Sequence, residues 1–429
     1  MLWLICGIPA ACAVNSADTC LCKAETEGSN DAFRFNEWDD QLATHEGPAR
    51  HHPITFSIGG FGYVMGGNYE YYTSNSNFDM HRFQPGKGWT KLSLPNPAPD
   101  GPRGYSYGVE LGGLGYLGFG IVNGRAKGDW WNYNPTLNKF TELKKFPGLE
   151  RWHPAMVAIE IEGESEAVEQ LIYVGCGSSP AGNRKDWWEY RVSSDSWIQR
   201  ADLPGPPRHH PYYWSAKIGD RMFAFVGFGH GSWQDGSIFK DVYRYDPLSL
   251  EWTRMKDFPG EARVAGTQFS YKSHGYILSG DGDDHSYMPT GEMHEYDATK
   301  DTWQKLPPHL GKSRWAPGCF VIGSSVYFTG GLNKATWQYP KHLQRYSLCE
   351  CRKETTTTQI VTKQSECQAQ CEFPSFPQKT HIFMFRRERV PEEQRRMRQQ
   401  KKMHQHDGRQ NMRRLSIWVC ERRRYWLQR

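Results

Sequence analysis

The stretch "YVGCGSSPAGNRKDWWEYRVSSDSWIQRADLPGPPRHHP" at residues 173–211 contains the pattern that decides the fold. It opens with a short apolar run that ends at Gly175 and Gly177, which predicts a buried strand followed by a tight turn. Tyr190 precedes Trp197 by seven positions, and Arg208 follows eleven residues later. Short apolar runs, glycine turns and large aromatic anchors in this order predict an all-β unit.

The same pattern recurs along the chain. Apolar runs that end at glycine are "YVMGG" (63–67), "YLGFG" (116–120), "YVGCG" (173–177), "AFVGFG" (224–229), "YILSGD" (276–281) and "YFTGG" (327–331). The aromatic pairs are Phe83 with Trp89, Tyr133 with Phe140, Tyr190 with Trp197, Tyr245 with Trp252, and Tyr296 with Trp303. The arginines that follow in register are Arg50, Arg103, Arg151, Arg208, Arg263 and Arg314. Their mean spacing is about 53 residues, a period that indicates a repeat architecture.

Over residues 33–348 the sequence resembles the kelch-repeat family, because the period, the glycine pairs and the aromatic pairs all match. The resemblance implies an all-β fold, a six-bladed β-propeller in which each repeat is a four-stranded antiparallel sheet. The segment "FNEWDDQLATHEGPAR" (35–50) precedes the first complete repeat, whereas the last repeat stops after Tyr346. We therefore expect the N-terminal strand around Trp38 to complete the sixth blade, which would leave no open sheet edge.

Composition supports this division of the chain. The 429 residues include 43 glycines and 17 tryptophans, which suits short strands and excludes a coiled coil or a largely disordered chain. The net charge of +5 combines +10 over residues 349–429 with −5 over the rest. An acidic propeller disfavours nucleic acid as its partner. The basic tail at 349–429 has few apolar positions, so we expect it to be disordered, and its candidate partner is an anionic surface.

The N-terminal segment and the cysteines bear on localisation. Residues 2–14 form an apolar run too short to span a membrane, and residues 1–24 are interpreted as a signal peptide or a leader. Nine of the 11 cysteines lie outside the repeats, at the two ends of the chain. Terminal clustering is typical of disulfides in a secreted or lumenal protein, and a cytoplasmic chain is the alternative.

Histidines and other polar residues gather in the loops that follow the repeat signals. In a blade, the loop after the second strand and the loop that leads to the next blade emerge on the same side of the ring. Seven of the 16 histidines fall in these loops, together with aspartates, arginines and tryptophans. The candidates for ligand binding at this mouth are Arg50, His51, His52, Arg151, His153, Arg208, His209, His210, His230, Trp233, Asp281, Asp283, Asp284, His285, Arg314 and Trp315.

These residue types allow two classes of function. Imidazoles and carboxylates at a concave mouth hydrogen-bond polar ligands, which favours a binding module for a protein or a glycan. The alternative is a carbohydrate-active enzyme, since the resemblance extends distantly to the kelch rings of sialic-acid epimerases and of galactose oxidase. The residues identify no cofactor and no catalytic group. If a metal binds, His209, His210 and His285 are the candidate ligands.

Overall fold

The computed structural model describes residues 37–348, except positions 41, 43, 45–46, 69–77, 102, 163–167, 232–235 and 284. The predicted leader at 1–24 and the predicted tail at 349–429 therefore lie outside the described residues. Almost all regular structure in the described part is β-strand, apart from a short 3₁₀ helix, η1 (Val192–Ser194). No helix in this part is long and apolar enough to cross a membrane.

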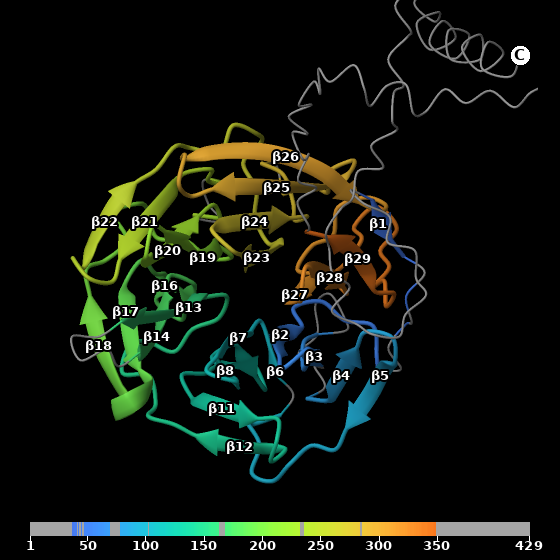
Figure 1. The fold of residues 1–429 in the computed structure, drawn as a ribbon, viewed down its shortest axis with the longest axis horizontal. Coiled ribbons are helices and arrows are strands. Elements are labelled where there is room, and N and C mark those ends of the chain that lie inside the picture. The colour runs from blue at the N-terminus through green and yellow to red at the C-terminus, as the bar shows by residue number, and fades with distance from the viewer. Residues whose placement is uncertain are drawn as a thin grey trace, which may run out of the picture. The chain divides into compact units, whose positions relative to one another are not determined.

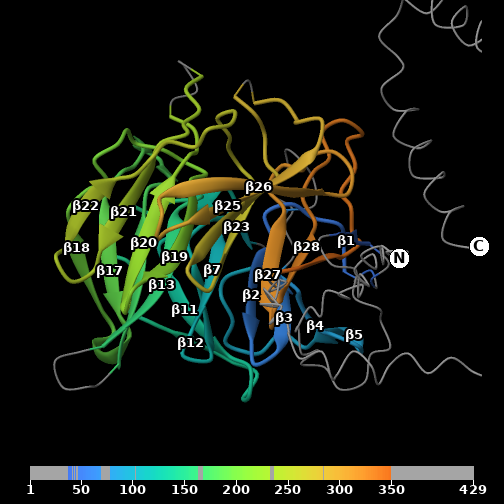
Figure 2. The same cartoon turned by 45° about the horizontal axis from the view of Figure 1, so that its top comes forward.

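Six antiparallel sheets of four strands each surround a common centre (Figures 1 and 2). The first three blades are β2 (Ile54–Ile58), β3 (Phe61–Met65), β4 (Met80–Gln84) and β5 (Gly88–Leu92); β7 (Tyr107–Leu111), β8 (Leu114–Gly118), β11 (Trp130–Asn134) and β12 (Lys139–Glu142); and β13 (Ala155–Glu162), β14 (Val168–Gly175), β17 (Trp187–Arg191) and β18 (Ser196–Arg200). The last three are β19 (Tyr212–Ile218), β20 (Arg221–Gly227), β21 (Val242–Asp246) and β22 (Glu251–Arg254); β23 (Thr267–Tyr271), β24 (His274–Leu278), β25 (Gly291–Asp297) and β26 (Thr302–His309); and β27 (Gly318–Ile322), β28 (Ser325–Thr329), β29 (Gln344–Ser347) and β1 (Trp38–Asp39).

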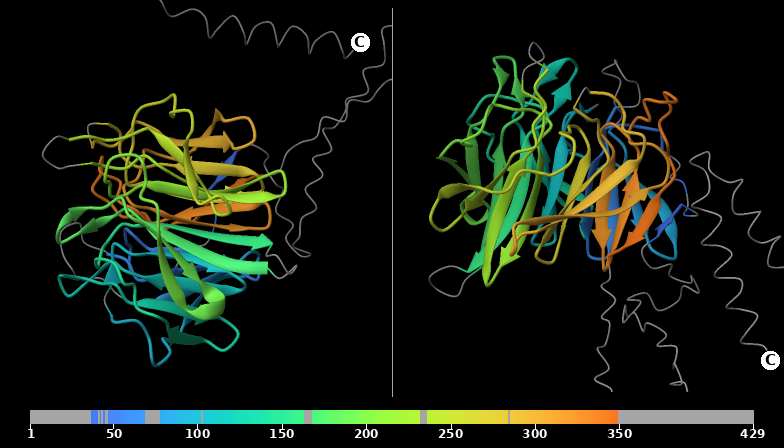
Figure 3. Two further views of the ribbon diagram at one scale, coloured as in Figure 1. Left: turned by 90° about the vertical axis from the view of Figure 1, so that its left-hand side faces the viewer. Right: turned by 90° about the horizontal axis from the view of Figure 1, so that it is seen from above.

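Short strands extend two of the loops, namely β6 (Arg103–Gly104), β9 (Ile121–Val122), β10 (Arg125–Ala126), β15 (Ser178–Ser179) and β16 (Gly182–Asn183). The innermost strands β2, β7, β13, β19, β23 and β27 contact one another in turn, and β27 returns to β2. These strands run between the two faces of the ring (Figure 3). The described sheets therefore form a closed β-propeller.

The glycine and arginine signals of the repeat meet between neighbouring blades. The amide of the last glycine in each apolar run donates to the carbonyl of the next blade's arginine, at 2.8–3.1 Å in all six cases. In the third blade, Gly177 donates to Arg208 at 2.8 Å and has a φ of +82°. A Cβ on Gly177 would lie 2.6 Å from the Trp152 carbonyl oxygen, so this close approach requires glycine. The glycines and arginines of the repeat thus form a ring of backbone hydrogen bonds that joins neighbouring blades.

The aromatic pairs seven residues apart are direct partners across the outer two strands. Tyr190 faces Trp197, Tyr245 faces Trp252, and the equivalent residues pair in the other blades. Trp130 and Trp187 are fully buried and lie edge-on against the aromatic pair of the following blade. The tandem tryptophans therefore supply inter-blade packing, as aromatic side chains with large buried area do.

The N-terminal strand β1 completes the sixth sheet by pairing with β29. Trp38 lies opposite Tyr346, and its indole Nε1 donates to the Pro307 carbonyl at 2.9 Å. Trp38 is buried among Phe328, Tyr346 and His309. The predicted location of the closing strand agrees with this pairing.

Candidate functional site

The loops on one face of the ring pair with each other blade by blade. His51 bridges Asn68, Trp152 bridges Ser178, and His209 bridges His230. Equivalent bridges join Val264 to Asp281 and Trp315 to Leu332, and β6 pairs with β9 in the second blade. We call this face the mouth. The predicted convergence of the two loop types on one face is therefore confirmed by their backbone pairing.

One position in each mouth loop has an unusual backbone. The second residue after each repeat arginine is left-handed, with φ between +48° and +58°, and these six axial residues are His52, Tyr105, His153, His210, Ala265 and Ala316. A left-handed backbone costs a non-glycine residue about 1–2 kcal/mol, so its sixfold recurrence reflects the architecture. Backbone bonds link axial residues of adjacent blades, for example from the His153 amide to the Tyr105 carbonyl at 3.0 Å.

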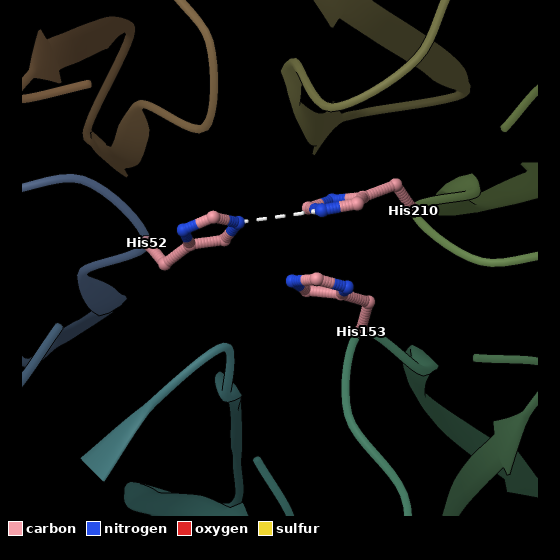
Figure 4. A group of neighbouring side chains, drawn as sticks. All are labelled: His52, His153 and His210. Carbon is pink, nitrogen blue, oxygen red and sulfur yellow. Dashed lines mark hydrogen bonds between the residues drawn. The ribbon is translucent and has the colours of Figure 1, made fainter. Parts of the chain in front are cut away.

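Three axial histidines meet at the centre of the mouth (Figure 4). His52 Nε2 lies 3.3 Å from His210 Nε2, and the His153 ring stacks on the His210 ring with centroids 3.4 Å apart. One ring nitrogen from each of the three lies within 4.8 Å of the others. All three side chains are buried, and neither ring nitrogen of His153 has a hydrogen-bond partner. We call His52, His153 and His210 the axial triad.

Neighbouring groups hold the other nitrogens of two of these rings. The Tyr107 hydroxyl lies 3.1 Å from His210 Nδ1, and His51 Nδ1 lies 2.5 Å from His52 Nδ1. Burial, followed by the neighbouring imidazoles, lowers the pKa of His52, His153 and His210 well below its ordinary value. The triad is therefore neutral at physiological pH, and each ring keeps an unprotonated nitrogen.

A second group of polar side chains borders the triad. The His230 ring lies 4.9 Å from that of His209 and 5.0 Å from that of His285. His285 Nδ1 is 3.0 Å from Asp281 Oδ2, and Lys334 Nζ forms an ion pair with the same oxygen. Burial, then His230 and His285, lowers the pKa of His209 to about 3. We call His209, His230, His285 and Asp281 the outer group.

The expected metal ligands are not the histidines that converge. Of His209, His210 and His285, only His210 belongs to the close group of three found among the described residues. His209 and His285 belong to the outer group instead. His209 precedes its axial residue and pairs with the loop of its own blade, whereas the next residue, His210, is left-handed. The adjacent residues His209 and His210 therefore belong to different groups, because only His210 occupies the axial position.

The arginine guanidinium groups are directed into the blades. In the third blade, Arg151 is buried, bonds both carboxylate oxygens of Asp186 at 2.8 Å and donates to the Cys176 carbonyl at 3.0 Å. The equivalent pairs are Arg50 with Asp79, Arg103 with Asp129, Arg208 with Asp241, and Arg263 with Glu292. Arg314 faces His342 Nε2 at 2.9 Å in place of a carboxylate. These contacts give Arg50, Arg151, Arg208 and Arg314 a structural role, in place of the expected ligand contact. We call each repeat arginine together with the side chain it binds a clamp.

The remaining expected residues are spread around the mouth. Trp315 is partly buried and its ring lies 4.6 Å from that of His52. Asp283 is exposed, while Trp233 and Asp284 lie outside the described residues. Sequence reasoning missed Tyr105 and Tyr107, because "RGYSY" (103–107) lacks the histidine–proline pattern of the other loops. Counting two residues from Arg103 would have found Tyr105.

A cavity lies along the axis next to the triad. Its volume is about 270 Å³, and residues from all six innermost strands line it. Tyr107, which contacts His210, also lines this cavity, together with Pro53, Gly266 and Pro317, each of which directly follows an axial residue. The triad therefore borders one end of the central cavity.

Comparison with known proteins identifies relatives of two kinds. N-acetylneuraminate epimerase of Yersinia enterocolitica is 32% identical over 116 residues, or 26% of this chain and 27% of the relative. The epimerase of Escherichia coli O157:H7 is 27% identical over 109 residues, or 25% and 28%. Mouse Kelch-like protein 35 is 26% identical over 211 residues, or 48% of this chain and 32% of the relative.

The aligned segments thus cover about a third or less of the length of these relatives. No protein-family model matches the chain. These similarities support the kelch-repeat resemblance over part of the chain, and the described sheets form the β-propeller that the resemblance implies.

Proposed function

We propose that this six-bladed kelch ring is a binding module whose mouth holds a polar ligand, a glycan or a segment of a protein. The observation that carries the proposal is the collection of neutral imidazoles at the mouth beside two exposed aromatic side chains. Tyr287 and Trp337 are 40% and 60% exposed, and both lie in loops that follow the second strand of a blade. Exposed tyrosine and tryptophan beside buried polar groups are typical of recognition surfaces.

Charged groups at the mouth suit neutral and acidic glycans alike, because Lys312 lies 4.8 Å from the centre of the Tyr287 ring. The repeat arginines bind carboxylates or His342 inside the blades, and Lys334 pairs with Asp281. Imidazole, amide and carboxylate groups of the mouth exchange hydrogen bonds with sugar hydroxyls, and the Lys312 ammonium offers a partner for an anionic group. A protein ligand would use the same aromatic side chains as its central contacts.

The test is binding of the full chain to an array of neutral and acidic glycans, followed by calorimetry with the best ligand. Trp337→Ala is expected to weaken binding at least tenfold, because it removes an aromatic side chain that is 60% exposed at the mouth. Leu248→Ala is the matched control, since Leu248 is 56% exposed in the turn between β21 and β22 at the other face. Equal binding by the two variants would refute the proposal, as would binding of the wild type to neither glycans nor a protein partner.

The second candidate is a carbohydrate-active enzyme of the epimerase or mutarotase type. Unprotonated buried imidazoles favour it, because neutral histidine accepts a proton from a sugar hydroxyl. The relatives named as N-acetylneuraminate epimerases favour it as well. NMR measurement of anomer interconversion, with wild type and His210→Asn, tests this candidate. A rate equal to the spontaneous one in the presence of wild-type protein would exclude it for the sugar tested.

A further inference from the structure

We propose that the axial triad, His52, His153 and His210, is a binding site for a divalent transition-metal ion, with Zn²⁺ as the ion of best fit. The triad brings together three buried imidazoles, and imidazole nitrogen is a preferred ligand of zinc, copper and nickel. The proposal goes beyond ligand binding at the mouth and does not depend on it. A glycan or protein ligand could bind at Tyr287 and Trp337 with or without a metal.

The distances fit a small tetrahedral ion. Zn–N bonds of 2.0–2.1 Å at tetrahedral angles place two ligand nitrogens about 3.3–3.4 Å apart. His52 Nε2 and His210 Nε2 are 3.3 Å apart. The nitrogen that His153 offers lies within 4.8 Å of both, so this ring would have to move toward them to reach ligand distance. A hard ion such as Mg²⁺ or Ca²⁺ prefers oxygen ligands and is not favoured here.

The hydrogen bonds around the triad have the arrangement that metal-binding histidines need. Tyr107 and His51 occupy the Nδ1 atoms of His210 and His52, which directs both Nε2 atoms toward each other. Metal-ligating histidines usually engage their second nitrogen in this way, which fixes the ring orientation. Both nitrogens of His153 are buried without a partner, at a cost of about 1–3 kcal/mol for such a group. A bound ion would give one of these nitrogens a partner.

The fold holds the three ligands on rigid elements. Each histidine comes from a different blade and occupies the left-handed axial position, directly before an innermost strand. The other axial residues, Tyr105, Ala265 and Ala316, offer no imidazole or carboxylate, so a fourth ligand would be the Tyr105 hydroxyl, water or a bound molecule. Three histidines with an open fourth position are the arrangement of several catalytic zinc sites.

The experiment is zinc titration of chelator-treated full-length protein in competition with a chromophoric chelator. The wild type is expected to bind one equivalent that His153→Ala loses, with affinity falling more than about 100-fold. Tyr107→Phe keeps all three ligands but removes the hydroxyl beside His210, so we expect a decrease of about 10- to 100-fold. His209→Ala and His285→Ala are matched controls from the outer group, and their affinity should stay within about threefold of wild type.

Thermal unfolding separates loss of the site from loss of the fold. His153→Ala removes no hydrogen bond but leaves a cavity beside the His210 ring, so the metal-free variant is expected to unfold cooperatively at a lower temperature than metal-free wild type. Zinc should then raise the melting temperature of the wild type but not of His153→Ala. Equal zinc affinity of wild type and His153→Ala would overturn the proposal. Loss of binding in His209→Ala or His285→Ala, with His153→Ala unaffected, would also overturn it by assigning the ion to the outer group.

Discussion

One buried contact distinguishes the sixth blade from the other five. In those five blades the repeat arginine pairs with an aspartate or glutamate, but Arg314 faces the imidazole of His342. Burial lowers the pKa of Arg314 to about 9, which still leaves it charged at neutral pH. In the third blade, burial alone would raise the pKa of Asp186, yet the hydrogen bond and charge of Arg151 lower it. Each clamp therefore depends on its carboxylate.

His342→Asp is expected to stabilise the protein by about 1–2 kcal/mol, because it supplies the carboxylate that the other clamps have. Asp186→Asn is the matched opposite change and should destabilise by about 3–5 kcal/mol, since it leaves Arg151 buried without a counter-charge. Thermal unfolding at pH 7.5 measures both. A destabilised His342→Asp would show that the imidazole is the better partner for Arg314.

At the scale of the blade, the residues of the repeat motif make two kinds of contact. The aromatic pair marks residues that face each other across the outer two strands, and the glycine pair marks the hydrogen bond to the next blade. Trp187 lies between the third and fourth blades, 5.1 Å from the ring of Trp252. A single tryptophan of this kind therefore contributes to two sheets.

Trp187→Ala is expected to destabilise the protein by about 3–5 kcal/mol, because it opens a cavity between two blades. Trp337→Ala provides the control, since Trp337 is 60% exposed and its removal should change stability by about 0.5 kcal/mol or less. Urea unfolding of both variants makes the comparison. Similar midpoints for the two would contradict the assignment of Trp187 to the inter-blade core.

At the scale of the whole molecule, the burial of many histidines makes stability depend on pH. Burial, followed by Arg314, lowers the pKa of His309 to about 3, and burial lowers that of His294 to about 4. Both are neutral in the folded protein, whereas the unfolded chain takes up their protons below about pH 6.5. The unfolded state then binds more protons, so the free energy of unfolding decreases as the pH falls from about 6.5 toward 4.

We therefore expect urea midpoints that are nearly constant from pH 8 to 7 and decrease steeply below pH 6.5. Each such histidine contributes a slope of about 1.4 kcal/mol per pH unit in this window. His309→Gln should reduce the slope by about that amount, and a substitution of the exposed Leu137 should not. A midpoint that is the same at pH 7.5 and pH 5 would refute this account.

Much of the ring follows from the sequence because its signals are local. Glycine pairs, aromatic pairs and arginines at a constant spacing predict the sheets, the face that the loops share and the N-terminal strand at Trp38. The sequence does not show which histidines converge, because a shift of one residue along a loop changes the direction of the side chain. His209 and His210 are adjacent, yet only the left-handed His210 joins His52 and His153. The arginines looked like ligand contacts because their clamp partners lie 26–35 residues away in sequence.

The most direct test of the axial triad as a metal site is X-ray absorption of the full chain loaded with one equivalent of Zn²⁺. The account predicts nitrogen or oxygen neighbours at about 2.0–2.1 Å, with the outer-shell signal of three imidazoles, and loss of that signal in His153→Ala. Sulfur neighbours at about 2.3 Å would assign the ion to cysteines at the chain ends. That result, or an imidazole signal that persists in His153→Ala, would contradict the account.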